Sequence, residues 1–239
     1  MTAPIPALVL TGAEKAFRGR PAVVGVDLVV GGGEVVGLIG ENGAGKSTTL
    51  RMVMGEVRPD AGEVRIGGSP SPLQRRRVGY VAQDSGLYPD LTGAENLEFL
   101  ARARDLPPAE RPAAFEAALE LSGLGEAAHR LLREWSGGMR QRLSLAAAFL
   151  GDPILVVLDE AFQGLDPGAL LTFRERLLRF AAEGGGAVVC SHNLDLLARV
   201  CGRVLLMERG RVSREIEGGD VAALEKCFRK PDAEIRDRS

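Results

Sequence analysis

The residues from Gly40 to Thr48 bring three glycines, one lysine and two hydroxyl side chains together directly after an apolar run. Gly40, Gly45, Lys46 and Ser47 fit the phosphate-binding P-loop pattern GxxxxGK[ST]. Glycines let backbone N–H groups curl around a phosphate, and the helix that follows directs its positive end at the same anion. The residues expected to bind a nucleoside triphosphate are Gly40, Glu41, Asn42, Gly43, Ala44, Gly45, Lys46, Ser47 and Thr48.

Within this loop, Lys46 is expected to reach the β- and γ-phosphates, and the Ser47 hydroxyl is expected to ligate Mg²⁺. Two adjacent acids follow a second apolar run, "ILVVLDE". A carboxylate at the end of a buried strand is costly unless it is satisfied, so Asp159 is expected to bind Mg²⁺ through water. Glu160 points in another direction and is the candidate general base for an attacking water. The alternative is a pair of helix-capping acids.

Two further polar residues follow strand candidates. His192 comes just after the buried run "AVVC", one strand–helix–strand crossover beyond the acids, so its side chain is expected to reach the γ-phosphate. Gln83 ends the strand candidate "VGYVAQ", where its amide can ligate Mg²⁺ and contact the attacking water. We therefore assign Lys46, Gln83, Glu160 and His192 to catalysis.

A second helix start with phosphate-binding character lies in "WSGGMRQR". Ser136 is a candidate N-cap, and Gly137 and Gly138 expose backbone amides at the helix N-terminus. The segment lies far from the P-loop in sequence. An ordinary helix cap is the alternative interpretation.

The hydrophobic pattern predicts the elements that position these residues. Strands are expected at 7–10, 26–30, 34–39, 62–66, 78–83, 154–160 and 186–192, with a hairpin at 203–212. An insert of helices runs from about 84 to about 150, and a further helix covers 168–183. The strand–helix–strand order indicates parallel βαβ units.

Composition excludes several classes of protein. The 239 residues include 30 Lys and Arg against 32 Asp and Glu, so no basic field indicates nucleic acid as a partner. Three cysteines without CxxC spacing indicate free thiols in a reducing cytoplasm. No apolar run approaches the roughly 18 residues of a membrane helix, so we expect a soluble chain.

The ordered series GENGAGKS, Gln83, SGGMRQR, ILVVLDE, GLD and His192 resembles the ATP-binding cassette (ABC) ATPases over essentially the whole chain. The resemblance implies an α/β fold: a P-loop NTPase core with a mostly parallel sheet, an N-terminal antiparallel β subdomain and an inserted α-helical subdomain. It implies one domain over 1–228, with the core and β subdomain in 1–83 and 151–228, the helical subdomain at about 84–150, and a loose tail at 229–239.

In that family two cassettes pair head to tail and sandwich two ATP molecules, with Mg²⁺, between the P-loop of one chain and the SGG helix of the other. The resemblance therefore implies a second cassette, expected to be an identical chain, that contributes Ser136, Gly137, Gly138 and Met139. Phe17 takes the place of the aromatic residue that stacks on adenine. Asp166 is implied to lie across the dimer seam.

This sequence departs from the family pattern at three places. The usual LSGGQ is Trp135 to Met139 here, which keeps the SGG but loses one glutamine amide. Met139 resembles the exporter branch that handles drugs, antibiotics and polysaccharides. Ala161-Phe162 replaces the usual Pro-Thr and removes no catalytic group, so we expect the site to hydrolyse ATP.

The resemblance further implies a place at the cytoplasmic face of a membrane, where residues 84–100 receive membrane-spanning subunits through Leu87, Tyr88 and Leu91. An ATPase subunit of an exporter is the favoured interpretation. An importer cassette, a non-transport cassette acting in assembly or on nucleic acid, and an inactive ATP-binding scaffold are the alternatives. The sequence does not name the cargo.

Overall fold

The central sheet of the fold contains the most apolar strands of the chain, with a polar strand at one edge. The computed structural model describes residues 5–83 and 86–228. Within them a sheet runs in the order β10-β9-β3-β8-β7-β6, and each neighbouring pair except β9–β10 is parallel, which confirms the expected mostly parallel sheet. Its strands are β3 (Val35–Ile39), β6 (Val78–Val81), β7 (Leu155–Asp159), β8 (Gly186–Cys190), β9 (Arg203–Glu208) and β10 (Arg211–Glu217).

Alternate residues of the central strands enter two separate cores, one on each face of the sheet. On one face Val156 and Val189 pack in a cluster with residues of α5, α6 and α7. On the other, Val157 and Val188 pack with residues of α1 and of the N-terminal strands. Covering on both faces explains why β3, β7 and β8 are apolar and buried throughout. The bounds are α1 (Lys46–Val53), α5 (Gly137–Ala148), α6 (Pro167–Ala182) and α7 (Leu194–Val200).

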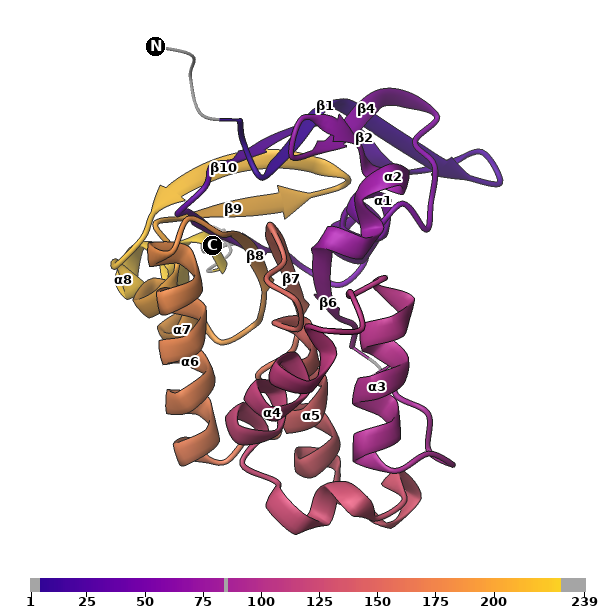
Figure 1. Cartoon of the computed structure of the whole chain (residues 1–239). Coiled ribbons are helices and arrows are strands. Elements are labelled where there is room, and N and C mark those ends of the chain that lie inside the picture. The colour runs from indigo at the N-terminus through magenta and orange to yellow at the C-terminus, as the bar shows by residue number, and fades with distance from the viewer. Residues whose placement is uncertain (1–4, 84–85, 229–239) are drawn as a thin grey trace, which may run out of the picture.

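A second, antiparallel sheet covers the α1 face, in the order β2-β1-β4-β5. The strand expected at 7–10 is longer in the structure because Gly12, with a φ of 53°, forms a bulge after which pairing with β2 resumes. This sheet lies at one end of the molecule, above the parallel sheet in Figure 1. Its strands are β1 (Leu8–Phe17), β2 (Arg20–Val30), β4 (Ala61–Ile66) and β5 (Ser69–Pro70).

The expected helical insert lies at the other end of the molecule, where α3, α4 and α5 group together (Figure 1). Thr92 begins α3 with a capping box, because its hydroxyl accepts from the Glu95 N–H while the Glu95 carboxylate accepts from the Thr92 N–H. Pro112 lies in the first turn of α4, where a missing N–H costs nothing, so it starts this helix rather than interrupting it. The bounds are α3 (Gly93–Ala103) and α4 (Arg111–Ser122), and 3-10 turns at Gly125–His129 and Leu132–Glu134 lead into α5.

The remaining predictions from the sequence differ from the structure, concern residues outside it, or are confirmed by it only in part. The short helix α2 (Ser71–Gln74), the helix α7 after β8 and the C-terminal α8 (Val221–Phe228) were not predicted. Residues 84–85 of the segment 84–100, which is expected to face a partner and is called the partner-facing segment below, and the tail at 229–239 lie outside the described residues. The division into subdomains at 84 and 150 stays a prediction. Two of the three predicted free thiols, Cys190 and Cys201, are free and buried, and burial raises the pKa of Cys201 to about 12.

Candidate nucleotide site

The predicted catalytic residues meet at one edge of the parallel sheet. Because β3, β8, β7 and β6 are adjacent and parallel, their carboxyl ends lie side by side. The P-loop follows β3, His192 follows β8, Asp159 ends β7 with Glu160 directly after it, and Gln83 follows β6. β6 ends at Val81, so Gln83 lies two residues beyond the strand and is exposed. The edge of an open α/β sheet at its strands' carboxyl ends is where such folds bind ligands.

Close approach of other backbone segments explains the P-loop glycines. A Cβ on Gly40 would lie 2.3 Å from the carbonyl oxygen of Met207, and one on Gly45 would lie 2.4 Å from that of Ala22. Both have positive φ, 153° and 105°, which other residues adopt at a cost. Gly43, with a φ of 82°, has open space where its Cβ would be. The loop is therefore packed at its two ends and open at its middle.

Lys46 is folded back into this loop. Its ammonium donates to the carbonyl oxygens of Gly40 at 2.7 Å and Glu41 at 3.1 Å, and the residue is only 8 % exposed. α1 begins at Lys46 with no side-chain cap and no acid in its first turn. The N–H groups that open a helix lack intrahelical partners and attract anions. The lysine, the free helix start and the exposed Ser47 beside them suit a phosphate.

The two acids take different conformations at the end of β7. Asp159 is the last residue of the strand and is 5 % exposed. Glu160 leaves the strand with a left-handed φ of 51°, which turns its side chain away from that of Asp159, and its N–H donates to the Cys190 carbonyl at 2.9 Å. Glu160 is 9 % exposed. Two buried carboxylates with separate directions are consistent with the two predicted roles.

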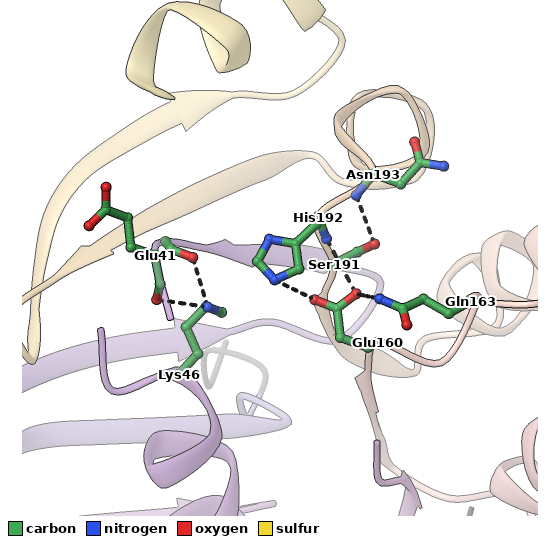
Figure 2. Close-up of polar contacts among 8 residues, drawn as sticks. Glu41, Lys46, Glu160, Gln163, Ser191, His192 and Asn193 are labelled. Carbon is green, nitrogen blue, oxygen red and sulfur yellow. Dashed lines mark hydrogen bonds and ion pairs between the residues drawn. The ribbon is translucent and has the colours of Figure 1, made fainter. Parts of the chain in front are cut away.

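His192 contacts the carboxylate of Glu160. Its Nε2 lies 3.3 Å from Oε1, a contact that is an ion pair when the imidazole is protonated, and its backbone N–H donates to Oε2 at 3.4 Å. Half of the side chain, 50 %, is exposed, so the ring borders both the carboxylate and the open side of the site. Figure 2 shows the imidazole on one side of the carboxylate and the amide of Gln163 on the other.

Sequence reasoning missed Gln163. Its side-chain amide donates to Glu160 Oε2 at 3.0 Å, and its N–H donates to the Glu160 carbonyl at 3.2 Å to close a turn. Gln141 of α5 was also missed, and it donates to the carbonyl of Ala161 in the same turn. The only available signal was the replacement of the family's usual Pro-Thr by Ala161-Phe162, directly before Gln163.

The residues of the SGG segment form a second group. Ser136 caps α5 as predicted, since its hydroxyl accepts from the Met139 N–H at 3.3 Å. A Cβ on Gly138 would lie 3.1 Å from the carbonyl oxygen of Gly164, so this segment borders residues 164–166. Ser136 and Gly137 are exposed. No contact between this segment and the P-loop was found among the described residues.

Asp166 belongs to the same neighbourhood. Its carboxylate caps α6 by accepting from the Ala169 N–H at 2.9 Å. That hydrogen bond, opposed by a small desolvation, lowers the pKa of Asp166. Asp166 is exposed in the single chain, which is consistent with the predicted place at a dimer interface.

Phe17 ends β1 with 43 % of its surface exposed. The Lys15 ammonium lies 5.7 Å from the centre of its ring. The close approach of Gly45 to Ala22 brings the β1–β2 hairpin against the P-loop. An exposed aromatic face beside the phosphate loop suits a stacked base.

The donors present also suit Mg²⁺. No cluster of three or more His, Cys, Asp and Glu side chains that could hold a metal was found in residues 5–83 and 86–228. The predicted ligands are instead a hydroxyl, an amide and a carboxylate, from Ser47, Gln83 and Asp159. Mg²⁺ prefers such oxygen ligands, few from protein and the rest from phosphate and water.

The partner-facing segment differs from the prediction in detail. Tyr88 and Phe99 stack edge to face with ring centres 4.8 Å apart, and they are 48 % and 43 % exposed. Leu87 packs against the core, and Leu91 is half-buried. Of the three predicted residues, Tyr88 is exposed and Leu87 and Leu91 are only partly so, and Phe99, which was not predicted, adds to the exposed apolar surface.

The fold and the gathered strand ends define a P-loop nucleoside triphosphatase. Comparison with protein families matches residues 23–163 to the family described as ABC transporter. The Nod factor export ATP-binding protein I of Burkholderia lata is 38 % identical over 226 residues, which are 93 % of this chain and 74 % of that protein. Its counterpart in Paraburkholderia xenovorans is 39 % identical over 202 residues, which are 83 % of this chain and 66 % of that protein.

Solved structures agree with this assignment. An ATP-binding subunit of an ABC transporter superposes with a TM-score of 0.84 at 31 % identity, covering 92 % of this chain and 93 % of that one. A dimeric ATP-binding cassette in a post-hydrolysis state, bound to ADP and Pi, gives 0.80 at 25 % identity over 88 % and 98 %. The chain belongs to the ABC transporter family and is an ATPase of that family, which confirms the resemblance seen in the sequence.

Proposed function

We propose that this chain is the ATP-hydrolysing subunit of a membrane exporter, and that it works as a dimer closed around two ATP molecules. The observation that carries the proposal is the buried Glu160 carboxylate, which contacts His192. His192 follows β8, the strand that pairs with the P-loop strand β3. The names of the Nod factor export relatives favour export over import. The chain spans 66 to 74 % of the length of these two relatives, so cargo and partners are part of the proposal.

The P-loop residues bind the triphosphate. Backbone N–H groups of Gly40–Thr48 and the start of α1 surround the β- and γ-phosphates, and Lys46 exchanges its contacts with the loop carbonyls for phosphate oxygens. Phe17 stacks on the adenine. The open middle of the loop at Gly43 leaves room for the ligand.

Hydrolysis uses Glu160 as general base. The carboxylate takes a proton from a water molecule while the water oxygen attacks the γ-phosphorus. The bond from the γ-phosphorus to the β–γ bridging oxygen breaks, and ADP leaves with that oxygen. The products are ADP and inorganic phosphate, and the proton on Glu160 passes to solvent. His192 donates a hydrogen bond to a γ-phosphate oxygen, and the Gln83 amide contacts the attacking water.

Ser47, Gln83 and Asp159 would hold Mg²⁺, with Asp159 reaching it through water. Bound there, the ion would supply positive charge against the phosphate oxygens. Asp159 suits this role because it is buried at the end of β7. This strand pairs with β8, which in turn lies beside β3, the strand that leads into the P-loop.

A second copy of the chain completes each site. Ser136 to Met139 lie beside residues 164–166 rather than beside their own P-loop, and the exposed SGG amides are free to meet another chain's nucleotide. Asp166 faces the same seam. The dimeric neighbour with ADP and Pi supports this arrangement.

Membrane-spanning subunits dock on the Tyr88–Phe99 surface, at the cytoplasmic face of the membrane. No helix among the described residues is long and apolar enough to cross a membrane itself. The proposed cargo is a drug-like, lipid or polymeric molecule.

The ATPase activity of Glu160→Gln tests the chemical part of the proposal. Loss of the general base should lower the hydrolysis rate roughly 10²- to 10⁴-fold while ATP still binds. The control is Glu175→Gln, the same change at an exposed position on α6. Equal turnover by the Glu160 variant and the wild-type chain would refute this role.

Co-purification tests the partner part. The tagged chain is recovered from membranes solubilised gently with ATP present, and the same is done for Tyr88→Ser/Phe99→Ser. The wild type should retain a polytopic membrane protein in stoichiometric amount, and the double variant should lose it while keeping nucleotide binding. Recovery of the wild type with soluble proteins alone would refute the exporter assignment.

A further inference from the structure

The two oxygens of the Glu160 carboxylate have different surroundings. Oε2 accepts from the Gln163 amide at 3.0 Å and from the His192 backbone N–H at 3.4 Å. Oε1 is buried, and no donor in the described part of the chain makes a hydrogen bond to it. The His192 ring nitrogen approaches Oε1 to 3.3 Å but without hydrogen-bonding geometry. Oε2 is thus held by the protein, whereas Oε1 remains able to accept a hydrogen bond or a proton.

The backbone that carries Gln163 is itself fixed. Glu160 begins the turn with a left-handed φ of 51°, and its N–H is bonded to Cys190 on the neighbouring strand. The Gln163 N–H closes the turn on the Glu160 carbonyl. Between them Phe162 is only 8 % exposed and belongs to the core, and the Ala161 carbonyl accepts from Gln141. A turn tied at four points limits where the Gln163 amide can lie.

We propose that Gln163 is a positioning residue for ATP hydrolysis, and that its amide fixes Oε2 of Glu160 so that Oε1 is the oxygen that takes the proton from water. The inference rests on the proposed function, in which Glu160 is the general base. Without the amide, Oε2 keeps only the longer hydrogen bond from the His192 N–H, so the carboxylate can rotate more widely about its terminal torsion, which is broad for a glutamate. A base displaced by about 1 Å can lose on the order of 10²-fold in rate.

Gln163→Met tests the inference, because methionine has a similar length but no donor. In single-turnover hydrolysis by the full chain, the rate should fall about 10- to 100-fold. The ATP concentration at half-saturation should stay within about twofold, because Gln163 acts on Glu160 rather than on the nucleotide. Gln163→Asn keeps an amide donor on a shorter stem and should recover part of the rate, whereas Gln163→Glu replaces the donor with an acceptor and should not.

A double-mutant cycle separates positioning from a general structural role. In the Glu160→Gln background, Gln163→Met should cause no further loss, because the carboxylate that it would position is already gone. An additional loss there, or a rate for Gln163→Met alone equal to the wild type, would overturn the inference while leaving Glu160 as the base. If Glu160→Gln itself turns over normally, the proposed function fails, and the inference fails with it.

Discussion

The Nζ of Lys46 lies 2.7 Å from the carbonyl oxygen of Gly40, six residues earlier in the chain, so the P-loop closes on its own lysine. The same ammonium also contacts the Glu41 carbonyl at 3.1 Å. A cation that bonds two loop carbonyls holds the loop in the curved shape that a phosphate requires. Nucleotide binding then replaces neutral acceptors by charged ones, which make stronger hydrogen bonds.

Lys46→Ala should weaken ATP binding. Hydrogen bonds to charged groups contribute about 1.5–3 kcal/mol each, so losing the ammonium should raise the Kd for ATP roughly 10- to 100-fold or more. Titration calorimetry on the nucleotide-free chain measures this. Lys226→Ala, a change at an exposed residue of α8, is the matched control and should leave the Kd unchanged. An unchanged Kd for Lys46→Ala would contradict the phosphate role.

Ser136→Arg should prevent ATP-dependent dimerisation without affecting ATP binding to one chain. The added guanidinium group occupies the exposed start of α5, where the second chain's nucleotide is proposed to lie. Light scattering in the Glu160→Gln background, where ATP persists, should detect dimers for the parent and monomers for Ser136→Arg. The control is Ser213→Arg on the exposed edge strand β10. Dimers in both variants would argue against the sandwich.

Motif residues could be placed from sequence because each follows a strand that is recognisable by itself. The buried runs before Gly40, Asp159 and His192 are unmistakably apolar, and parallel pairing then forces their ends to one edge. The end of a strand is harder to predict from sequence where a β-bulge interrupts the pairing. At Gly12 the strand continues past a residue that looks like a turn, because the bulge absorbs one residue and pairing resumes.

The contact between Gln163 and Glu160 could not be predicted in this way. It depends on the left-handed φ of Glu160 and on the turn that follows, neither of which has a signature in local composition. The partial burial of Leu87 could not be predicted from periodicity either, because a leucine in a loop can face either the core or a partner. Only the three-dimensional packing decides between them.

Arg203→Met should destabilise the folded chain by about 1–3 kcal/mol, because hydrogen bonds to charged groups are lost while the apolar stem is kept. Arg203 of β9 joins the two sheets: it bonds Glu34 at 2.7 Å and Glu215 at 2.8 Å, and it also bonds the Val29 carbonyl of β2. Its side chain is 24 % exposed. Urea denaturation measures the free energy of unfolding.

The control for Arg203 is Arg102→Met, which removes an ion pair with Glu98 on the surface of α3, where the arginine is 64 % exposed. Such pairs contribute about 0.3–0.5 kcal/mol. Equal losses of stability for the two variants would show that the link between the sheets adds nothing.

The N-cap of α6 should make stability depend on pH in a defined direction. The Ala169 N–H lowers the pKa of Asp166 in the folded chain below its ordinary 3.8. A carboxyl with a depressed folded pKa contributes stability that is full above the unfolded pKa and lost as pH falls through the folded pKa. At pH 7 the Tm of the wild type should be higher than that of Asp166→Asn. This difference in Tm should shrink below about pH 4. A Tm difference that does not vary with pH would contradict the charged cap.

Trp135 is the single tryptophan of the chain, and it is 4 % exposed. A Cβ on Gly93 would lie 2.5 Å from its ring, so the indole packs against the start of α3, which lies within the segment 84–100 that is proposed to face membrane subunits. The backbone of Trp135 leads directly into Ser136. The molecule therefore carries its single tryptophan fluorophore where the proposed membrane-partner surface adjoins the segment proposed to meet nucleotide. Its emission provides an optical signal, without any added label, for following both events in the same sample.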